Sequence, residues 1–282
     1  MTFRWLIAAL ALVTATLPVA GTVRAAEPQP PMLWDGNERL PKPDLSQLPR
    51  LRFLTTTDFP PFNFLDTAGR LSGFHVDLAR AICAELAVAD KCQIQALPWA
   101  ELDAALRKGD GEAIMAGIAV TKETRSQYAF SRSYLQFPAR FIMPKAQTVT
   151  EPLYEKLKGK RVGVVTGSAH ERMLREDFGM VTIAPFPTQE ALLTDLKAGK
   201  VDAAFGDGMR LGFWLAGSEA ADCCRFAGGP YLAPEYLGTG LAIAVKPEDQ
   251  ALATALDYAL QQIALKGTFA ELYLRYFPVS FY

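Results

Sequence analysis

Two polar side chains that could hold an anion follow a short apolar stretch near the middle of the chain. The segment 112–131, EAIMAGIAVTKETRSQYAFS, begins as a buried strand, breaks at Gly117 and then presents Thr121 and Arg125. Ligands of open α/β sheets lie where strands end, because backbone donors and helix starts converge there. A guanidinium at that place can hold a carboxylate through two parallel hydrogen bonds. An exposed arginine on a surface turn is the alternative explanation.

Few side chains are suited to acid–base or covalent chemistry. Asp58, Asp207 and His170 are the candidate acids and bases, and no GxSxG motif accompanies them. An enzyme needs a poised set of such groups in one cleft. With only His75 and His170 and no CxxC pair, a zinc site is not expected either. We therefore predict no catalytic residue, no metal and no cofactor.

The elements that would carry these residues occur twice along the chain. The segment 106–113, LRKGDGEA, is echoed by 196–203, LKAGKVDA. Each copy has the pattern of a helix closed by glycine, followed at a fixed distance by an acidic residue and a strand of small residues. A break then ends each strand, at Gly117 in the first copy and at Asp207 and Gly208 in the second. The echo predicts two α/β lobes of similar construction.

Two apolar strands, 140–143 and 240–245, are the candidates for crossing between the lobes. We assign both strands to the side of the first lobe, onto which helices within 249–277 pack back. The first lobe then comprises residues 51–145 and 238–282. The second lobe is an insertion, 146–237.

The N-terminus has the features of an export signal. Arg4 precedes an apolar stretch, 5–19, and small residues stand at the cleavage positions of a site after Ala25. An uncleaved membrane anchor is the alternative. Residues 26–50 form a proline-rich leader that we expect to lie along the surface with Leu33 and Trp34 docked.

Four cysteines in an exported chain favour disulfides. Cys83 lies on a predicted helix and Cys92 just beyond its end, so a bridge between them would pin that helix end. Cys223 and Cys224 are adjacent, and a disulfide between neighbours closes an eight-membered ring. The sequence leaves open whether these two form that ring or remain two thiols.

The charge balance bears on the class of partner. Lys and Arg number 29 against 30 Asp and Glu, a formal net charge of −1. A general affinity for nucleic acid or anionic membranes would need a basic excess. We expect neither kind of partner.

The order of short motifs over residues 51–278 resembles that of the periplasmic solute-binding proteins of amino-acid ABC transporters, family 3. Each motif is weak alone, but so many in one order are specific. They are FPPF at 59–62, GFHVDLA at 73–79, Trp99, AGI at 116–118 with Thr121, FS at 130–131 with Tyr134, VGV at 162–164, GS at 167–168, DA at 202–203 with Asp207, GTGLAI at 238–243 and GTF at 267–269.

This resemblance implies a periplasmic-binding-protein-like fold, two α/β lobes joined by two crossing strands, with the ligand cleft between them. Two aromatic residues match rings that sandwich the ligand side chain, the segment 116–119 and the loop at 168–169 match groups that meet its carboxylate, and Asp207 matches the acid that pairs with its ammonium group. The implied ligand-binding residues are Phe59, Trp99, Ala116, Gly117, Ala119, Thr121, Arg125, Ser168, Ala169 and Asp207. The alternatives are that the aromatic residues belong to the core and that Ser168 and Asp207 are helix caps.

The chain departs from the family pattern in the loop after the first lobe's strand. The family's carboxylate-binding arginine should stand at position 124, which is Thr124 here, and Arg125 comes one residue late. Ala119 also replaces a usual hydroxyl residue. Either the loop is shifted so that Arg125 still reaches the ligand, or the ligand is not a standard α-amino acid. Arg140 is a less favoured substitute, and His75 should lie on the surface or between the lobes.

The sequence thus predicts a monomeric periplasmic binding protein that captures a small polar solute between closing lobes. By the resemblance, the solute is an amino acid or a related compound, and the partner is the membrane permease of an ABC transporter. The pair Cys83 and Cys92 also falls where some cationic-amino-acid binders of this family carry a disulfide. The alternatives are a dehydratase-type enzyme on the same fold and a binding module with an altered ligand.

Overall fold

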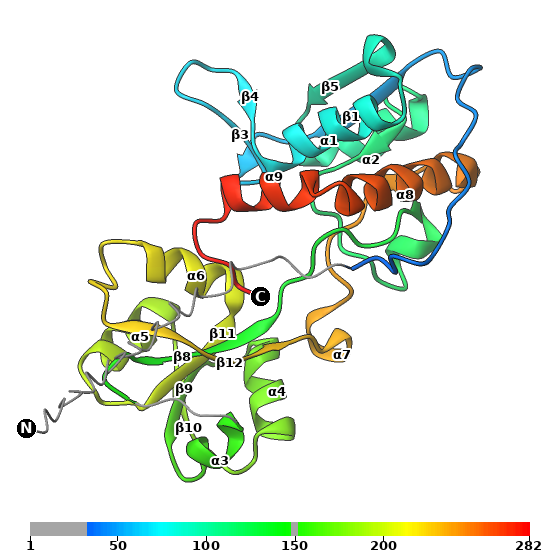
Figure 1. Cartoon of the computed structure of the whole chain (residues 1–282). Helices are drawn as coiled ribbons and strands as arrows, with labels where there is room; N and C mark the ends of the chain where they lie inside the picture. The colour runs from blue at the N-terminus through cyan, green and yellow to red at the C-terminus, as the bar shows by residue number, and fades with distance from the viewer. Residues whose placement is uncertain (1–32, 148–151) are drawn as a thin grey trace, which may run out of the picture.

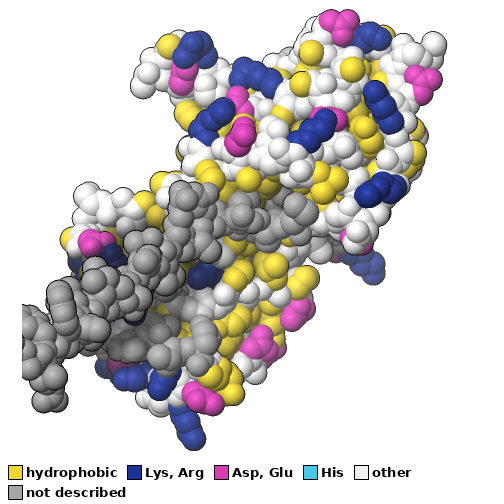
Figure 2. Space-filling model, viewed as in Figure 1, with side chains coloured by type: hydrophobic (Ala, Val, Ile, Leu, Met, Phe, Trp, Pro, Cys, Tyr) yellow, Lys and Arg dark blue, Asp and Glu magenta, His cyan; other side chains and the backbone are white. Residues whose placement is uncertain are grey.

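The computed structural model describes residues 33–147 and 152–282, which form two lobes with chain segments passing between them (Figure 1). The predicted signal peptide, 1–25, and the first part of the leader lie outside the described residues. Within the described ranges, no helix combines the length and the apolar character needed to cross a membrane. Acidic and basic side chains are interspersed over the visible faces of both lobes (Figure 2).

The first lobe is built on a five-stranded sheet in the order β5, β1, β6, β13, β7. The strands are β1 (Leu51–Thr55), β5 (Cys92–Ala96), β6 (Ala113–Ile114), β7 (Ala129–Phe130) and β13 (Ala244–Val245). β1 is parallel to β5 and β6, whereas β13 is antiparallel to β6 and β7. Its helices are α1 (Phe74–Glu85), α2 (Leu102–Lys108), α8 (Gln250–Leu265) and α9 (Thr268–Tyr276). A small sheet of β2 (Asp58–Phe59), β3 (Asn63–Leu65) and β4 (Leu71–Ser72) and the short helices η1 (Ala89–Lys91), η2 (Trp99–Glu101) and η3 (Thr124–Ser126) complete it.

The second lobe has a five-stranded sheet in the order β10, β9, β11, β8, β12. The strands are β8 (Ala139–Pro144), β9 (Arg161–Val165), β10 (Thr182–Phe186), β11 (Ala203–Asp207) and β12 (Cys224–Tyr231). β9 is parallel to β10 and β11, and β8 is antiparallel to β11 and β12. Its helices are α3 (Leu153–Leu157), α4 (Ala169–Asp177), α5 (Gln189–Lys197), α6 (Gly208–Ala216) and α7 (Pro234–Leu237). The predicted fold class, two α/β lobes, is confirmed.

The two lobes repeat one local construction, as the sequence echo predicts. α2 ends at Gly109 with φ 79°, and Gly199 after α5 has φ 71°, a conformation that glycine adopts without strain. Glu112 then accepts the backbone N–H of Arg52 at 2.6 Å, and Asp202 accepts that of Arg161 at 2.9 Å. Each acid therefore ties the start of its small-residue strand to the neighbouring parallel strand.

The strand 140–143, expected in the first lobe, lies in the second. As part of β8 it lies between β11 and β12, so the chain leaves the first sheet before Ala139 rather than at 146. An apolar strand fits the interior of either sheet, so its composition does not indicate its partners. The second apolar strand does contribute β13 to the first sheet.

The described part of the leader packs on the first lobe. Trp34 is 6% exposed and Leu33 contacts the same core, as expected. The guanidinium of Arg132 lies 5.4 Å from the centre of the Trp34 ring and pairs with Glu38. The amide of Gln261 donates to the backbone carbonyl of Glu38 at 3.2 Å, which fastens the leader to α8.

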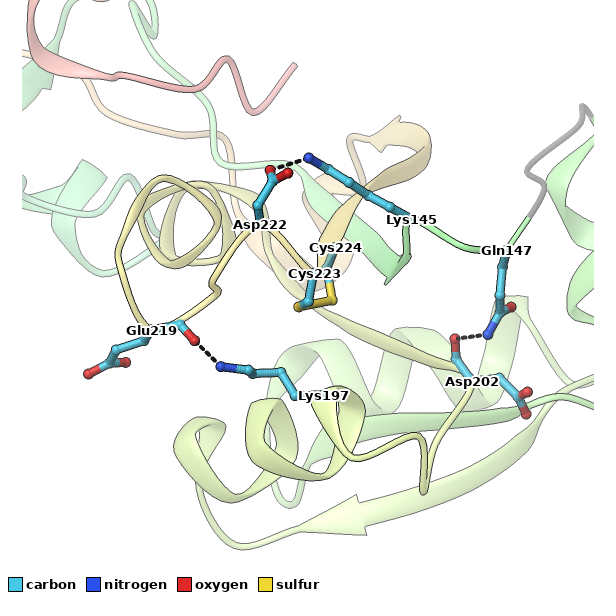
Figure 3. The surroundings of a disulfide bond; sticks show 8 residues. All are labelled: Lys145, Gln147, Lys197, Asp202, Glu219, Asp222, Cys223 and Cys224. Carbon is cyan, nitrogen blue, oxygen red and sulfur yellow. Dashed lines mark hydrogen bonds and ion pairs between the residues drawn. A yellow bond between two sulfur atoms is a disulfide. The ribbon is translucent and has the colours of Figure 1, made fainter.

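Both cysteine pairs are bridged. The predicted disulfide between Cys83 and Cys92 is present and links α1 to the start of β5. Cys223 and Cys224 also form a disulfide, at the start of β12 (Figure 3), which is one of the two alternatives that the sequence left open.

His75 lies inside the first lobe, so the expectation of a surface or interlobe position is wrong. Its side chain is 1% exposed, with Nδ1 2.8 Å from Asn63 Oδ1 and Nε2 2.8 Å from the Tyr134 hydroxyl. The amide of Asn63 in turn donates to the Thr56 hydroxyl at 2.7 Å. Burial lowers the pKa of His75 to about 3. Partners distant in sequence explain why a polar ring can be buried here.

This depressed pKa predicts a specific loss of stability in acid. The unfolded histidine gains a proton below about pH 6.5 and the folded one does not, so unfolding becomes easier by about 1.4 kcal/mol per pH unit between about 6.5 and 3. We expect His75→Gln to be less stable than the parent at pH 7.5, with the difference shrinking by roughly 2 kcal/mol at pH 5. Urea unfolding at the two pH values measures this. Tyr134→Phe, which keeps His75, should retain the parent's pH dependence, and parallel profiles for the parent and His75→Gln would refute the assignment.

Candidate functional site

In the first lobe, Phe59 and Gly117 form a platform at the carboxyl end of the sheet. Phe59, on β2, stacks on Phe62 with ring centres 4.6 Å apart. Gly117, beyond β6, has φ 87°, and a Cβ atom there would lie 2.8 Å from Cε1 of Phe59. Only glycine therefore lets the ring lie against this backbone. Phe59 as a whole remains half-buried rather than fully enclosed.

The second aromatic candidate, Trp99, is not a core residue. It begins the short helix η2 and is 55% exposed. Of the candidates that follow β6, Ala116 is buried, whereas Ala119 and Thr121 are exposed. An exposed tryptophan at a strand–helix junction is available to cover an apolar or cationic group.

The loop after β6 is closed by Thr124 rather than by an arginine. The Thr124 hydroxyl donates to the carbonyl of Ala119 at 2.7 Å and accepts the N–H of Thr121 at 2.9 Å. Arg125 lies next to it on η3 with an exposed side chain, and no ion pair joins it to any carboxylate of the described residues. The loop is thus self-contained, and the register shift leaves Arg125 at the surface.

In the second lobe, Ser168 caps the helix that follows β9. Its hydroxyl accepts the N–H of Glu171 at 3.0 Å and donates to the carbonyl of Val165 at 2.7 Å, while the Glu171 carboxylate accepts the N–H of Gly167 at 2.7 Å. This resembles a capping box, except that Glu171 accepts the N–H of Gly167 rather than that of the cap residue Ser168. The hydroxyl is therefore engaged, and the first N–H groups of α4, beginning at Ala169, are the donors that a helix leaves without intrahelical partners.

Asp207 ends β11 and caps α6. One carboxylate oxygen, Oδ1, accepts the N–H of Arg210 at 2.8 Å. Burial raises the pKa of this carboxyl, an effect that hydrogen bonding to Arg210 and the nearby His170 partly oppose. Asp207 is therefore a helix cap, as the alternative explanation states, but the cap hydrogen bond involves only Oδ1 of the carboxylate. No salt bridge joins Asp207 to a cation within the described residues.

His170, on the first turn of α4, lies beside Asp207. Burial lowers the pKa of its imidazole, although the Asp207 charge acts in the opposite direction. Its ring lies edge-on to Phe205, with centres 6.2 Å apart, and its buried Nε2 has no hydrogen-bond partner in the described structure. A buried nitrogen without a partner is available to a ligand.

Ser168, His170 and Asp207 line one groove of about 1270 Å³ in the second lobe. The groove continues between the start of α5, at Thr188, and the far end of α6, and its lining residues all belong to this lobe. The structure brings the second-lobe candidates together and leaves the first-lobe candidates outside the groove. Sequence reasoning missed the part formed by α5. A threonine directly after a strand, here the cap of α5, was the available signal.

The disulfide between Cys223 and Cys224 follows, in sequence, a loop that lines this groove. The loop 217–219 lines the groove, and Lys197 of α5 donates to the backbone carbonyl of Glu219 (Figure 3). Lys145 pairs with Asp222 on the other side of the disulfide.

Among the described residues, no group of three or more metal-binding side chains is present.

The first lobe thus presents two partly exposed aromatic side chains, Phe59 and Trp99, and the second lobe presents helix starts around the half-buried carboxylate of Asp207. The sequence profile of the bacterial extracellular solute-binding proteins, family 3, matches residues 51–279. The chain belongs to this family.

Relatives of this family 3 protein carry names that refer to amino acids. It is 30% identical over 227 residues to the "Putative ABC transporter arginine-binding protein 2" of Escherichia coli K12, covering 80% of this chain and 90% of that protein. It is 29% identical over 235 residues to the "Histidine-binding periplasmic protein" of the same strain, covering 82% and 89%.

A crystal structure of an ancestral cyclohexadienyl dehydratase shares the fold, with a TM-score of 0.68 at 20% identity, covering 83% of this chain and 95% of that one. Because the two sequences are only 20% identical, this similarity shows a shared fold and nothing about function.

The contact between Phe59 and Gly117 predicts an effect on the platform. Gly117→Ala places a methyl group into the Phe59 ring and also strains a positive φ, which together should cost about 2–3 kcal/mol in the free energy of unfolding. Gly69→Ala is the matched control, because Gly69 has φ 74° with no atom within 4 Å and so carries the backbone strain alone. Urea unfolding of the two variants gives the difference. Equal losses would show that Phe59 does not rest on Gly117.

Proposed function

We propose that this protein binds an amino acid with a cationic side chain between its lobes and delivers it to the permease of an ABC transporter. The observation that carries the proposal is Asp207, a half-buried carboxylate that lines the groove and forms no salt bridge within the described structure. Burial makes its charge costly, and an ammonium group close to it would offset that cost. The names of the two relatives support this ligand class.

The anionic end of such a ligand needs donors, and the second lobe has them. The start of α4 presents backbone N–H groups next to the groove, and the helix dipole favours negative charge at that end. His170 Nε2 lies on the same first turn. We infer that the ligand carboxylate is held here, with backbone groups of Gly117 and Ala119 meeting it from the first lobe.

The side chain of the ligand would lie against aromatic surfaces of the first lobe. Phe59 is half-buried and Trp99 is 55% exposed, so both offer ring faces. A guanidinium or imidazolium stacked on such rings gains a cation–π contribution. L-Arginine is therefore the first ligand to test, followed by L-histidine and L-lysine.

Binding would shift the population from open to closed lobes. In this structure the groove residues belong to one lobe, so a ligand seated there gains further contacts only when the first lobe closes on it. The closed form is then stabilised by the difference in ligand affinity between the two forms. The permease would recognise that form. We propose a monomeric protein acting in the periplasm, without catalysis.

Asp207→Asn separates charge from capping. Asparagine caps a helix as well as aspartate does, so the melting temperature should change little. Removing the partner of the ligand ammonium should weaken the binding of L-arginine by about 10- to 100-fold. Isothermal titration calorimetry measures the affinity. Asp195→Asn is the control, because Asp195 lies near the C-terminal end of α5 and does not line the groove. Equal affinities for the parent and Asp207→Asn would remove Asp207 from the site.

Arg125→Ala tests whether the register shift has removed the clamp. Since the Arg125 side chain is exposed and Thr124 closes the loop, we expect the affinity for L-arginine to change by less than about twofold, the range of an exposed charge. The same calorimetric titration measures it. A loss of tenfold or more would show that the loop rearranges to bring Arg125 to the ligand carboxylate.

A further inference from the structure

The C-terminal segment, residues 277–282, contacts both lobes. It leaves α9 and runs toward α6 of the second lobe (Figure 1). Phe277 and Phe281 are each 1% exposed and belong to the main core of the first lobe. The Tyr282 hydroxyl accepts the N–H of Gln136 at 2.9 Å and donates to its carbonyl at 2.5 Å, in the segment that leads from β7 to β8. The segment therefore lies beside one of the two crossings.

Phe281 is held from both sides through its backbone. Its N–H donates to the hydroxyl of Tyr273 in the first lobe, at 3.1 Å. Its carbonyl accepts Nη1 of Arg140 in the second lobe, at 3.0 Å. Successive polar groups of one residue thus join α9 to β8.

Helix α6 has glycine at two positions where the segment passes it, Gly208 and Gly212. A Cβ atom on Gly208 would lie 2.8 Å from Cγ of Arg140 and 3.3 Å from the carbonyl oxygen of Phe281. One on Gly212 would lie 3.6 Å from the carbonyl oxygen of Val279. These two glycines, one turn apart, let the segment lie directly against the helix that begins after Asp207.

Arg140 carries a buried charge that needs this segment. Its side chain is 8% exposed and its guanidinium lies over the ring of Phe226, 4.4 Å from the centre. Its Nε has no hydrogen-bond partner, and no carboxylate of the described residues forms an ion pair with it. A buried cation is costly unless hydrogen bonds compensate it. The Phe281 carbonyl supplies such a bond.

We propose that residues 277–282 are a third connection between the lobes, and that Arg140 is a positioning residue which restrains α6, and with it Asp207, relative to the first lobe in the ligand-free protein, before the lobes close. The inference rests on the proposed function only for the role of Asp207 in binding. If the aromatic platform of the first lobe and the groove of the second are held at a defined separation, less conformational entropy is lost when the lobes close on the ligand. Loosening the connection should therefore broaden the interlobe distances and weaken binding together.

Spin labels on Arg80→Cys of α1 and Lys156→Cys of α3, with both native disulfides intact, report the interlobe distance in the ligand-free protein. Two variants cut the connection in different ways: Arg140→Met, and a chain ending at Pro278. Arg225→Met is the matched control, because Arg225 of β12 also donates to a backbone carbonyl, that of Gln147 at 2.9 Å, but within one lobe. Double electron–electron resonance gives the distance distribution, and calorimetry with L-arginine gives the affinity.

We expect both variants to broaden the distribution and to weaken L-arginine binding by about three- to tenfold, the scale of lost pre-organisation, with Arg225→Met unchanged in both. A distribution as narrow as the parent's, accompanied only by a lower melting temperature, would overturn the proposal and reduce the segment to core packing. If the parent does not bind L-arginine, the proposed ligand is wrong, and the distance distribution alone still decides the role of the segment.

Discussion

The antiparallel pairing of β11 with β8 constrains the whole junction between the lobes. Asp207 pairs with Ala139 and Gly206 with Arg140, so the carboxylate of the groove stands beside the first residues after the crossing. Paired residues of adjacent strands point to the same face, so Arg140 shares a face with Gly206. Asp207, the next residue of β11, points to the opposite face, so the charges of Asp207 and Arg140 do not neutralise each other. The buried charge of Arg140 and the half-buried charge of Asp207 therefore each need a partner outside the sheet. Arg140 finds the carbonyl of Phe281, and Asp207 remains available to a ligand.

Three helices of the second lobe begin at the carboxyl edge of its sheet, and each is capped by the residue before it: Ser168, Thr188 or Asp207. The caps occupy side-chain oxygens, but the helix starts still direct backbone donors toward the groove. A carboxylate acceptor and N–H donors therefore lie a short distance apart in one lobe. That is the arrangement that the two charged ends of an amino acid require.

Features that depend on neighbouring residues could be predicted from the sequence. The echoed glycines and acids, the bridge from Cys83 to Cys92 and the docking of Trp34 all follow from spacing and composition. It did not specify which sheet takes an apolar strand, because β8 would be buried in either. Nor did it indicate that His75 is buried, since the hydrogen bonds that permit burial come from Asn63 and from Tyr134, 59 residues away. The candidate residues for ligand contact could be named, but the groove wall from α5 depends on how helices pack.

Because position 124 is threonine, the first lobe lacks a directional ionic contact at this place, and other parts of the molecule must define the geometry of binding. Where the first lobe would have offered a guanidinium with fixed directions, it offers ring faces and a loop whose polar groups bond to one another. Attraction between a ligand and aromatic faces is weakly directional, so it does not by itself define how far the lobes should close. The directional contacts then lie in the second lobe, and their position relative to the aromatic platform must come from the connections between lobes. A close-packed third connection, held through the backbone of Phe281, adds to what the two crossings provide.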